Sequence, residues 1–340
     1  VKMRRPYSGG VAMMLSRLHA RALPSAVRAM SGVAAGDNVG SLGASEVAVK
    51  MMAAPLGTKS MRGCGVVTGV GSGVSGIAVD DLVVAKSGLG AFRPVAKASA
   101  SALAKVPAGI PVEYAGLIGA PCKAAGLLKG LKAGDVVVQS GADTLVGQSV
   151  VQMAKAAGIT TISIVPSCPD QESVINILQT LGGDIVVPEQ YALTWRFTRL
   201  LSDVPAPALA INYIASSTPE VPAAGTKPSK LRALVESASP DELTKIKVAM
   251  LTAKIASTTV TYGEADAYGD ETAAEAYDSI GDVAELMKSN KLSLWVENYP
   301  PEDYEYATKK IAGPFCGMRA MVLKFSSECD IEELNWLNEA

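Results

Sequence analysis

The sequence predicts an α/β protein in which a twisted, barrel-like β domain precedes a doubly wound parallel sheet. Three observations lead to this fold class. The 340 residues are enough for two domains. Apolar residues form 49% of the chain and charged residues only 19%, a composition typical of a packed core. Short β-branched runs separated by glycines give way, in the middle of the chain, to alternating strands and helices.

The first unit is rich in glycine and β-branched residues. Its expected strands are short β-branched runs, namely residues 47–53, 65–70, 81–85 and 96–106. Because helical stretches are few here, residues 45–110 favour a closed, twisted sheet. The alanine-rich stretch 112–131 then predicts a helix, which residues 119–122 interrupt.

The second unit alternates strands and helices. Its first elements are expected as strand 136–139, turn 140–147, helix 148–157, strand 160–165, a polar helix and strand 185–187. This order is typical of a doubly wound nucleotide-binding half, in which a phosphate lies at the N-terminus of the first helix. Later elements are expected as strands 208–214, 258–262 and 321–325, a charged helical stretch before 254, an acidic helix within 264–290 and a helix from 304 to 309.

The chain begins with a basic segment. Residues 1–36 carry six Lys and Arg and no acidic residue, which leaves 25 basic against 33 acidic residues in the remainder, a net charge of about −8. An Arg-rich, acid-free segment with Ser and Ala has the composition of a mitochondrial targeting sequence. A basic surface arm is the alternative interpretation.

The rarity of histidine excludes several kinds of site. His19 is the only histidine, so one chain cannot build a His-based triad or a His-ligated zinc site. The cysteines are scattered and odd in number: Cys64, Cys122, Cys168, Cys316 and Cys329. Their spacing argues against a metal knuckle or a disulfide framework and favours a reducing compartment. No metal site, transmembrane helix or nucleic-acid-binding surface is predicted.

Two stretches around the predicted first helix, 131–139 and 146–154, resemble the medium-chain dehydrogenase/reductase family. Within it, the chain is similar to mitochondrial trans-2-enoyl thioester reductases, which reduce enoyl thioesters with NADPH. Supporting motifs follow in the expected order: 49–55, 87–93, 119–122, 209–212, 259–263 and 303–304. The resemblance implies a GroES-like β-barrel domain and a Rossmann domain. The expected division is an arm at 1–36, the β domain at 37–115 plus 291–340, and the Rossmann domain at 116–290.

The chain departs from this family where the proton donor should stand. Such reductases carry a catalytic tyrosine on a long loop after the strand that ends here at Pro55. Residues 56–69 are few and contain no tyrosine, and Tyr7, Tyr114 and Tyr262 lie in other motifs. General-acid help is typically worth about 10²–10⁴-fold in rate. No catalytic residue is therefore predicted, and Cys122, without histidine nearby, is expected to be a packed side chain.

The expected cofactor turn has also changed. Its candidate cofactor-binding residues, taken as vestigial, are Ser140, Asp143, Leu145, Val146, Gly147 and Gln148. The family has glycine in place of Leu145, so that backbone can approach the pyrophosphate. A leucine there is expected to occupy that space, or else to be tolerated in a shifted turn. Asp143 adds negative charge close to the phosphates.

The loop expected to select the cofactor, residues 166–170, has no arginine for the 2′-phosphate of NADPH. Asp170, the nearest acid for an NAD ribose, is expected instead in a turn or helix cap. No cofactor is therefore expected, with NADP or NAD as the ligand if a site survives.

These departures favour a non-catalytic, enoyl-reductase-like protein. Its expected role is that of a structural or accessory subunit of a mitochondrial assembly, a respiratory complex being one specific case, in the matrix or on the matrix side of the inner membrane. Compared with the family, segment 263–290 is shorter and segment 219–254 is longer. Because the family uses the former partly for dimer pairing, its homodimer surface is expected to be altered here. The alternative is an active NAD(P)H-dependent enoyl thioester or quinone oxidoreductase.

Overall fold

The structure is a computed structural model, and it describes residues 41–56, 63–86, 95–214, 260–264, 274–311, 313 and 318–325. The basic segment 1–36, including His19, and the charged stretch before residue 254 lie outside these residues. Within them, no helix is both long enough and apolar enough to cross a membrane.

Strands from both ends of the described chain form one seven-stranded sheet. Its strands are β1 (Glu46–Pro55), β2 (Cys64–Val70), β3 (Leu82–Ala85), β4 (Val95–Ser99), β5 (Leu103–Lys105), β11 (Trp295–Tyr299) and β12 (Arg319–Lys324). Strand β1 is the centre, because it pairs antiparallel with β2, β4 and β12. Two irregularities in its pairing with β2, one of them between Ala48 and Val49, let this long strand curve and exchange partners.

Five parallel strands form the second sheet, in the order β10-β9-β6-β7-β8. They are β6 (Val136–Ser140), β7 (Thr160–Val165), β8 (Ile185–Pro188), β9 (Leu209–Ile214) and β10 (Val260–Glu264). Two helices follow the first two strands, α5 (Leu145–Ala157) and α6 (Gln171–Thr180), and α7 (Glu189–Ala192) and α8 (Trp195–Leu201) follow β8. The strands of this sheet are continuous apolar runs, which are typical of parallel strands covered on both faces. In β6, for example, Val136, Val137 and Val138 are all buried.

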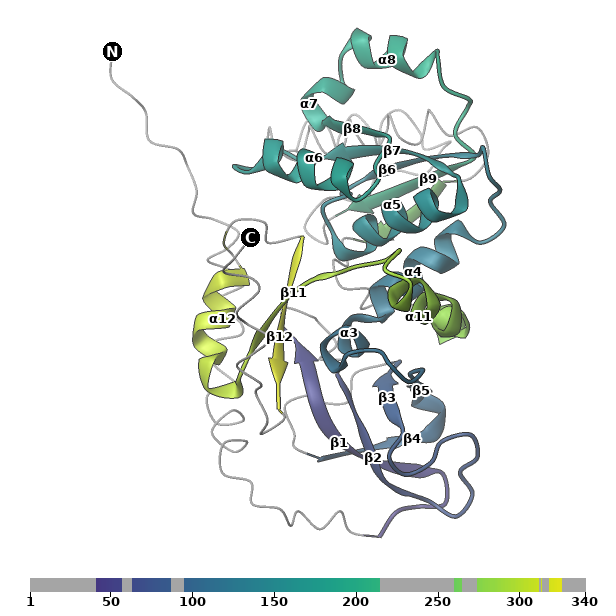
Figure 1. The fold of residues 1–340 in the computed structure, drawn as a ribbon, viewed down its shortest axis with the longest axis vertical. Coiled ribbons are helices and arrows are strands. Elements are labelled where there is room, and N and C mark those ends of the chain that lie inside the picture. Colours follow the sequence, from purple (N-terminus) through teal and green to yellow (C-terminus); the bar gives the residue numbers. More distant parts are fainter. Residues whose placement is uncertain are drawn as a thin grey trace, which may run out of the picture.

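The two sheets are joined by helices and a shared core (Figure 1). The connecting helices are α3 (Val112–Leu117), α4 (Gly119–Leu128) and α11 (Ile280–Lys288), and α12 (Tyr304–Ile311) packs on β12. One buried cluster contains Ala53 and Val322 of the first sheet together with Val137 and Leu145 of the second unit. Because this core is shared, the two units pack as one body.

The predicted fold class is confirmed: a barrel-like β unit adjoins a doubly wound parallel sheet. The predicted domain limits stay a prediction. Several local expectations differ from the structure. The run 96–106 is two strands joined by a 3-10 turn at Ala100–Ala102, and strand β11 was not predicted. The alanine-rich stretch breaks at Ile118, one residue before the predicted interruption, and Gly119 begins α4.

The most consequential difference concerns α5. The helix begins at Leu145, three residues before the predicted start, because Thr144 caps it. The side-chain oxygen of Thr144 accepts a hydrogen bond of 3.0 Å from the Gly147 N–H. Leu145, Val146 and Gly147 therefore form the first helical turn instead of the preceding loop.

Candidate functional site

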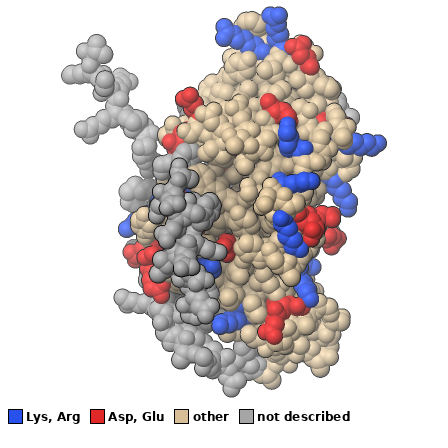
Figure 2. Space-filling view, in the orientation of Figure 1, with Lys and Arg blue, Asp and Glu red and all other residues tan. Residues whose placement is uncertain are grey.

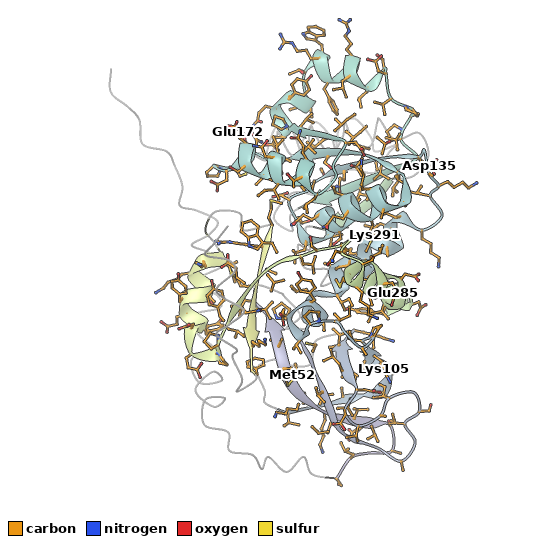
Figure 3. All side chains as sticks on the ribbon, viewed as in Figure 1. Met52, Lys105, Asp135, Glu172, Glu285 and Lys291 are labelled. Carbon is orange, nitrogen blue, oxygen red and sulfur yellow. The ribbon has the colours of Figure 1, made fainter. Side chains whose placement is uncertain are left out.

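The order of strands in the parallel sheet reverses at β6: β7 and β8 lie on one side of it, and β9 and β10 lie on the other. Ser140, the last residue of β6, stands opposite Ile164 of β7 on one side and Asn212 of β9 on the other. In open α/β sheets, ligands bind in the crevice at this point of reversal. Figure 3 labels Glu172, in α6, at the left of this unit and Asp135, before β6, at its right.

A tight turn leads from β6 into α5. Gly141 has a φ of 70°, and its N–H donates to the Ile164 carbonyl at 3.1 Å. The Thr144 N–H then donates to the Gly141 carbonyl at 3.1 Å. Neither the N–H of Leu145 nor that of Val146 is hydrogen-bonded to any other described residue. Two free donors at the positive end of a helix dipole can accept an anion such as a phosphate.

Gly147 is required by packing within this turn. A Cβ at this position would lie 2.7 Å from the Ala142 Cα and 2.7 Å from the Gly141 carbonyl oxygen. Both are backbone atoms, which cannot move aside as a flexible side chain would. This glycine therefore serves helix–turn contact in the protein itself, whether or not a ligand binds.

Leu145 is fully buried. Its side chain has 0% exposure and belongs to the same buried cluster as Ile118 and Val137. Val146, the next residue, is equally buried. We expected the Leu145 side chain to occupy the space of the pyrophosphate. Instead it points into the protein core from the first turn of α5. That it excludes a pyrophosphate stays a prediction.

Two glutamines of α5 connect this helix to the C-terminal part of the first sheet. The Gln148 amide donates to the Met318 carbonyl, just before β12, at 3.0 Å. One turn later, Gln152 donates to the Ser293 carbonyl at 3.0 Å and accepts from the Ser293 N–H at 2.8 Å. The Gln148 amide thus helps to hold the two units together, and its expected place at the cofactor stays a prediction. A polar i, i+4 pair on an otherwise apolar helix was the sequence signal for this contact.

Near this junction lies a charged cluster, which we call the Glu297 cluster: Glu297, Tyr299, Lys310 and Arg319. The two carboxylate oxygens of Glu297 accept from Arg319 at 2.9 Å, Lys310 at 3.2 Å and Tyr299 at 2.7 Å. Burial opposes ionisation of Glu297, but these three donors together lower its pKa below the usual value. Burial and the neighbouring carboxylate raise the pKa of Tyr299. The tyrosine therefore holds its proton more firmly than usual.

Arg319, the first residue of β12, follows Met318, whose carbonyl accepts from Gln148 of α5. Its side chain is only 11% exposed, and its Nη1 is paired with Glu297. The Nη2 donates to the Lys310 carbonyl at 3.2 Å. Its Nε is buried without a hydrogen-bond partner. The sequence did not identify this cluster, because its members come from two strands and a helix.

The loop after β7 provides no basic side chain. Asp170 lies in a turn and at the N-cap position of α6, as expected, although its side chain makes no capping hydrogen bond. Gln171 instead donates to the Val165 and Pro166 carbonyls. Ser167 is hydrogen-bonded to Gln190. These contacts tie the loop to its own sheet.

The connection between β1 and β2 is short. Ala53 of β1 stands opposite Cys64 of β2, which fixes the two ends as neighbouring strands. Leu56, the last described residue of the first arm, donates its N–H to the Met321 carbonyl. Between Pro55 and Cys64 the chain has only eight residues, none of them tyrosine. Of the tyrosines considered above, Tyr114 donates to the Leu294 carbonyl at 3.1 Å, and Tyr262 lies in β10.

Two of the three described cysteines, Cys64 and Cys122, are poor nucleophiles. Burial raises the pKa of Cys122 to about 12 and that of Cys64 to about 12, so both thiols stay protonated at neutral pH. This agrees with the expectation that Cys122 is a packed side chain. Within the described ranges, no group of three or more His, Cys, Asp or Glu residues is arranged to hold a metal ion.

Several known proteins with similar sequences are mitochondrial enoyl-[acyl-carrier-protein] reductases. The chain is 42% identical over 168 residues to the mitochondrial enoyl-[acyl-carrier-protein] reductase of Dictyostelium discoideum, covering 48% of each protein. It is 31% identical over 247 residues to the human protein of that name, covering 63% of this chain and 66% of the relative. The matches thus span about half to two thirds of the relatives' length. No family model matches the chain.

Solved structures show the same fold at low identity. The mitochondrial 2-enoyl thioester reductase heterodimer of Candida tropicalis gives a TM-score of 0.61 at 15% identity, covering 85% of this chain and 93% of the other. A mycobacterial protein in complex with NADPH gives a TM-score of 0.59 at 20% identity, covering 84% and 93%. Both comparisons establish the arrangement of the two units.

Proposed function

Because this chain is a medium-chain dehydrogenase/reductase related to the mitochondrial enoyl-[acyl-carrier-protein] reductases, we propose that it is a non-catalytic subunit of a mitochondrial assembly. It keeps the reductase fold and lacks the proton donor of the enoyl thioester reductases. The names of the relatives support a mitochondrial location, in the matrix or on the matrix side of the inner membrane. A respiratory complex is one specific assembly that this proposal includes.

The observation that carries the proposal is the short β1–β2 connection. Pairing of Ala53 with Cys64 leaves eight residues between Pro55 and Cys64, and none can act as a phenolic acid. Reduction of an enoyl thioester requires a proton at the α-carbon after hydride transfer. The raised pKa of Tyr299 makes this tyrosine a weaker acid than an ordinary one, so it is a poor substitute.

The charges around the β6–α5 turn support the same conclusion. The loop 166–170 has no basic residue, and Asp143 stands in the turn itself. Arg319, which follows the Gln148 contact at Met318, is ion-paired with Glu297, and Lys310 shares the same carboxylate. A dinucleotide would therefore meet few unpaired positive charges. The altered segments 219–254 and 263–290 are the proposed places where the oligomer surface differs from that of the relatives.

A second candidate function is an active NAD(P)H-dependent enoyl thioester or quinone oxidoreductase. The turn favours it, because Thr144 caps α5 and the N–H groups of Leu145 and Val146 are free to hold a phosphate. Two of the structural neighbours are complexes with NADP and crotonyl-CoA. This candidate needs a proton donor from solvent or from a residue outside those discussed above.

The two functions are separated by one comparison of cofactor binding and turnover. Purified full chain is titrated with NADPH and NADH by calorimetry and then assayed for crotonyl-CoA reduction, with the human relative as positive control. We expect no turnover by this chain under conditions in which the control reacts. Turnover dependent on either nucleotide would overturn the non-catalytic proposal.

Three variants test why a nucleotide would fail to bind. If Leu145 is the obstruction, Leu145→Gly should increase NADPH affinity, with Leu145→Ala as a variant that keeps the helix start. If neutralisation of Arg319 is responsible, Glu297→Gln should increase affinity instead. No gain in any of them would place the cause outside this turn.

The assembly role has its own test. The endogenous chain is followed by native electrophoresis and fractionation of mitochondria. We expect it in a particle much larger than a dimer, and the co-purifying subunits then identify the assembly. Recovery only as a free monomer or dimer would defeat this part of the proposal.

A further inference from the structure

The end of the molecule formed by α7 and α8 carries an exposed aromatic and cationic surface, which we call the Trp195 tip: Leu193, Trp195, Arg196 and Arg199. Trp195 is 69% exposed and Leu193 is 41% exposed. Among the large hydrophobic side chains that the structure describes, Trp195 is the most exposed. Exposure of large apolar side chains to water is unfavourable, and neighbouring exposed apolar residues point to an interaction surface.

The tip is held rigidly from below. Phe197 is fully buried and packs edge-on against Tyr191, with 6.3 Å between ring centroids. The Thr194 hydroxyl donates to the Tyr191 carbonyl at 2.7 Å, which fixes the turn between the two helices. Anchoring of Phe197 keeps its neighbours, Trp195 and Arg196, on the outer side of α8. The exposure of the tryptophan is therefore built into the local fold.

Both charged residues of the Trp195 tip are basic. Between Glu189, which is buried, and Asp203 the chain carries two arginines and no acidic residue. The Arg196 guanidinium lies 5.9 Å from the centre of the Trp195 ring. Figure 2 shows basic side chains, with acidic ones beside them, at this end of an otherwise mixed surface. The whole chain has a net charge of −2, so this cationic end is opposite in sign to the protein.

From this surface we propose that the Trp195 tip docks on an anionic lipid bilayer. Tryptophan favours the membrane–water interface, because its ring is apolar and its N–H is polar. Arginine pairs with lipid phosphates through a planar fork of donors. The inference does not depend on whether the chain is catalytic.

The small area of the tip favours a bilayer over a protein partner. Stable protein interfaces use about 20–30 residues and about 800 Å² on each side. The tip offers a few side chains on a short helix at one extremity of the molecule (Figure 1). A bilayer is planar and yields to a single inserted ring, so contact by a protruding end is sufficient. Each basic residue near an anionic surface raises the membrane partition coefficient by about fivefold. With two arginines the attraction is weak, and salt screens it.

Vesicle flotation tests the inference with the full chain. We expect binding to vesicles of phosphatidylcholine with phosphatidylglycerol at low salt, and little binding to phosphatidylcholine alone. The double variant Arg196→Gln/Arg199→Gln should lower binding by about tenfold or more. Trp195→Ala should lower it as well, and Trp195→Phe should keep part of it.

Matched variants elsewhere control for charge and exposure. Lys132→Gln/Lys291→Gln removes the same charge from exposed positions outside the tip, and Tyr306→Ala removes another exposed ring. Both should bind as the unmodified chain does, and thermal melts verify that every variant is folded. The inference is overturned if the unmodified chain does not bind anionic vesicles, or if tip and control variants lose binding equally.

Discussion

The β6–α5 turn and the β1–β2 connection differ in the number of described contacts that constrain their conformation. The turn is constrained by the Thr144 cap, by the close backbone approach at Gly147 and by the contacts of Gln148 and Gln152 with the other unit. The β1–β2 connection is fixed by strand pairing at its ends. The β6–α5 turn is thus also a structural joint, whereas the described ends of the connection are held by strand pairing and by the buried Leu56, with residues 57–62 outside the described residues.

For the non-catalytic function that we propose, this difference gives a reason why the fold would persist after loss of a proton donor. Loss of a catalytic loop costs little folding free energy when its ends remain paired strands. Loss of the turn would open backbone contacts and the junction between the two units. Retention of the turn is therefore weak support for cofactor binding, because folding alone requires it.

The largest expected effect is at Gly147. Gly147→Ala places a methyl group against the backbone of Gly141 and Ala142, and we expect a loss of about 3 kcal/mol in the free energy of unfolding, measured by urea denaturation. Gly281→Ala is the control, because no atom lies within 4 Å of a Cβ there, and it should stabilise α11 by about 0.5 kcal/mol. Equal effects would show that the close approach is not limiting.

The next effect is at the junction of the two units. Gln152→Leu removes the acceptor of the Ser293 N–H and the donor to its carbonyl, and should cost about 2 kcal/mol. Gln171→Leu is the control, since Gln171 bonds within its own unit. We expect the first variant alone to separate calorimetric unfolding into two transitions. A single transition in both would mean that the glutamine does not couple the units.

A smaller effect is expected at the helix cap. Thr144→Ala removes the acceptor of the Gly147 N–H and should lower stability by about 1 kcal/mol. Thr144→Ser keeps the side-chain oxygen and should lie within a few tenths of the original value. The comparison fails if serine destabilises α5 as much as alanine does.

The smallest effect is expected in the β1–β2 connection. Insertion of a flexible Gly/Ser segment that doubles its length should cost about 0.6 kcal/mol, because loop-closure entropy grows slowly with length. A loss above about 2 kcal/mol would show that this connection, too, has a structural role. Stability is measured by urea denaturation alongside Gly147→Ala, so the two regions are compared on one scale.

Much of the fold followed from local pattern. Strands β1, β2, β3, β7 and β9 were predicted within one or two residues, because β-branched runs between glycines have few alternatives. The start of α5 was wrong, because Leu145 and Val146 were assigned to a glycine-type turn and the Thr144 cap was not weighed. Strand β11 was missed, because its residues, Trp295–Tyr299, alternate weakly and find their partner in β12.

The sequence by itself determined the fold class, the absence of a tyrosine between Pro55 and Cys64, and the position of the β6–α5 turn. These depend on residue identity and on neighbours within a few positions. Only the tertiary structure decided that Gln148 and Gln152 join the two units, that Glu297 neutralises Arg319, and that Leu145 is buried. The partners in these contacts lie far apart in the chain or in separate elements, so no local pattern records them. The same is true of Trp195, whose exposure depends on what α8 packs against.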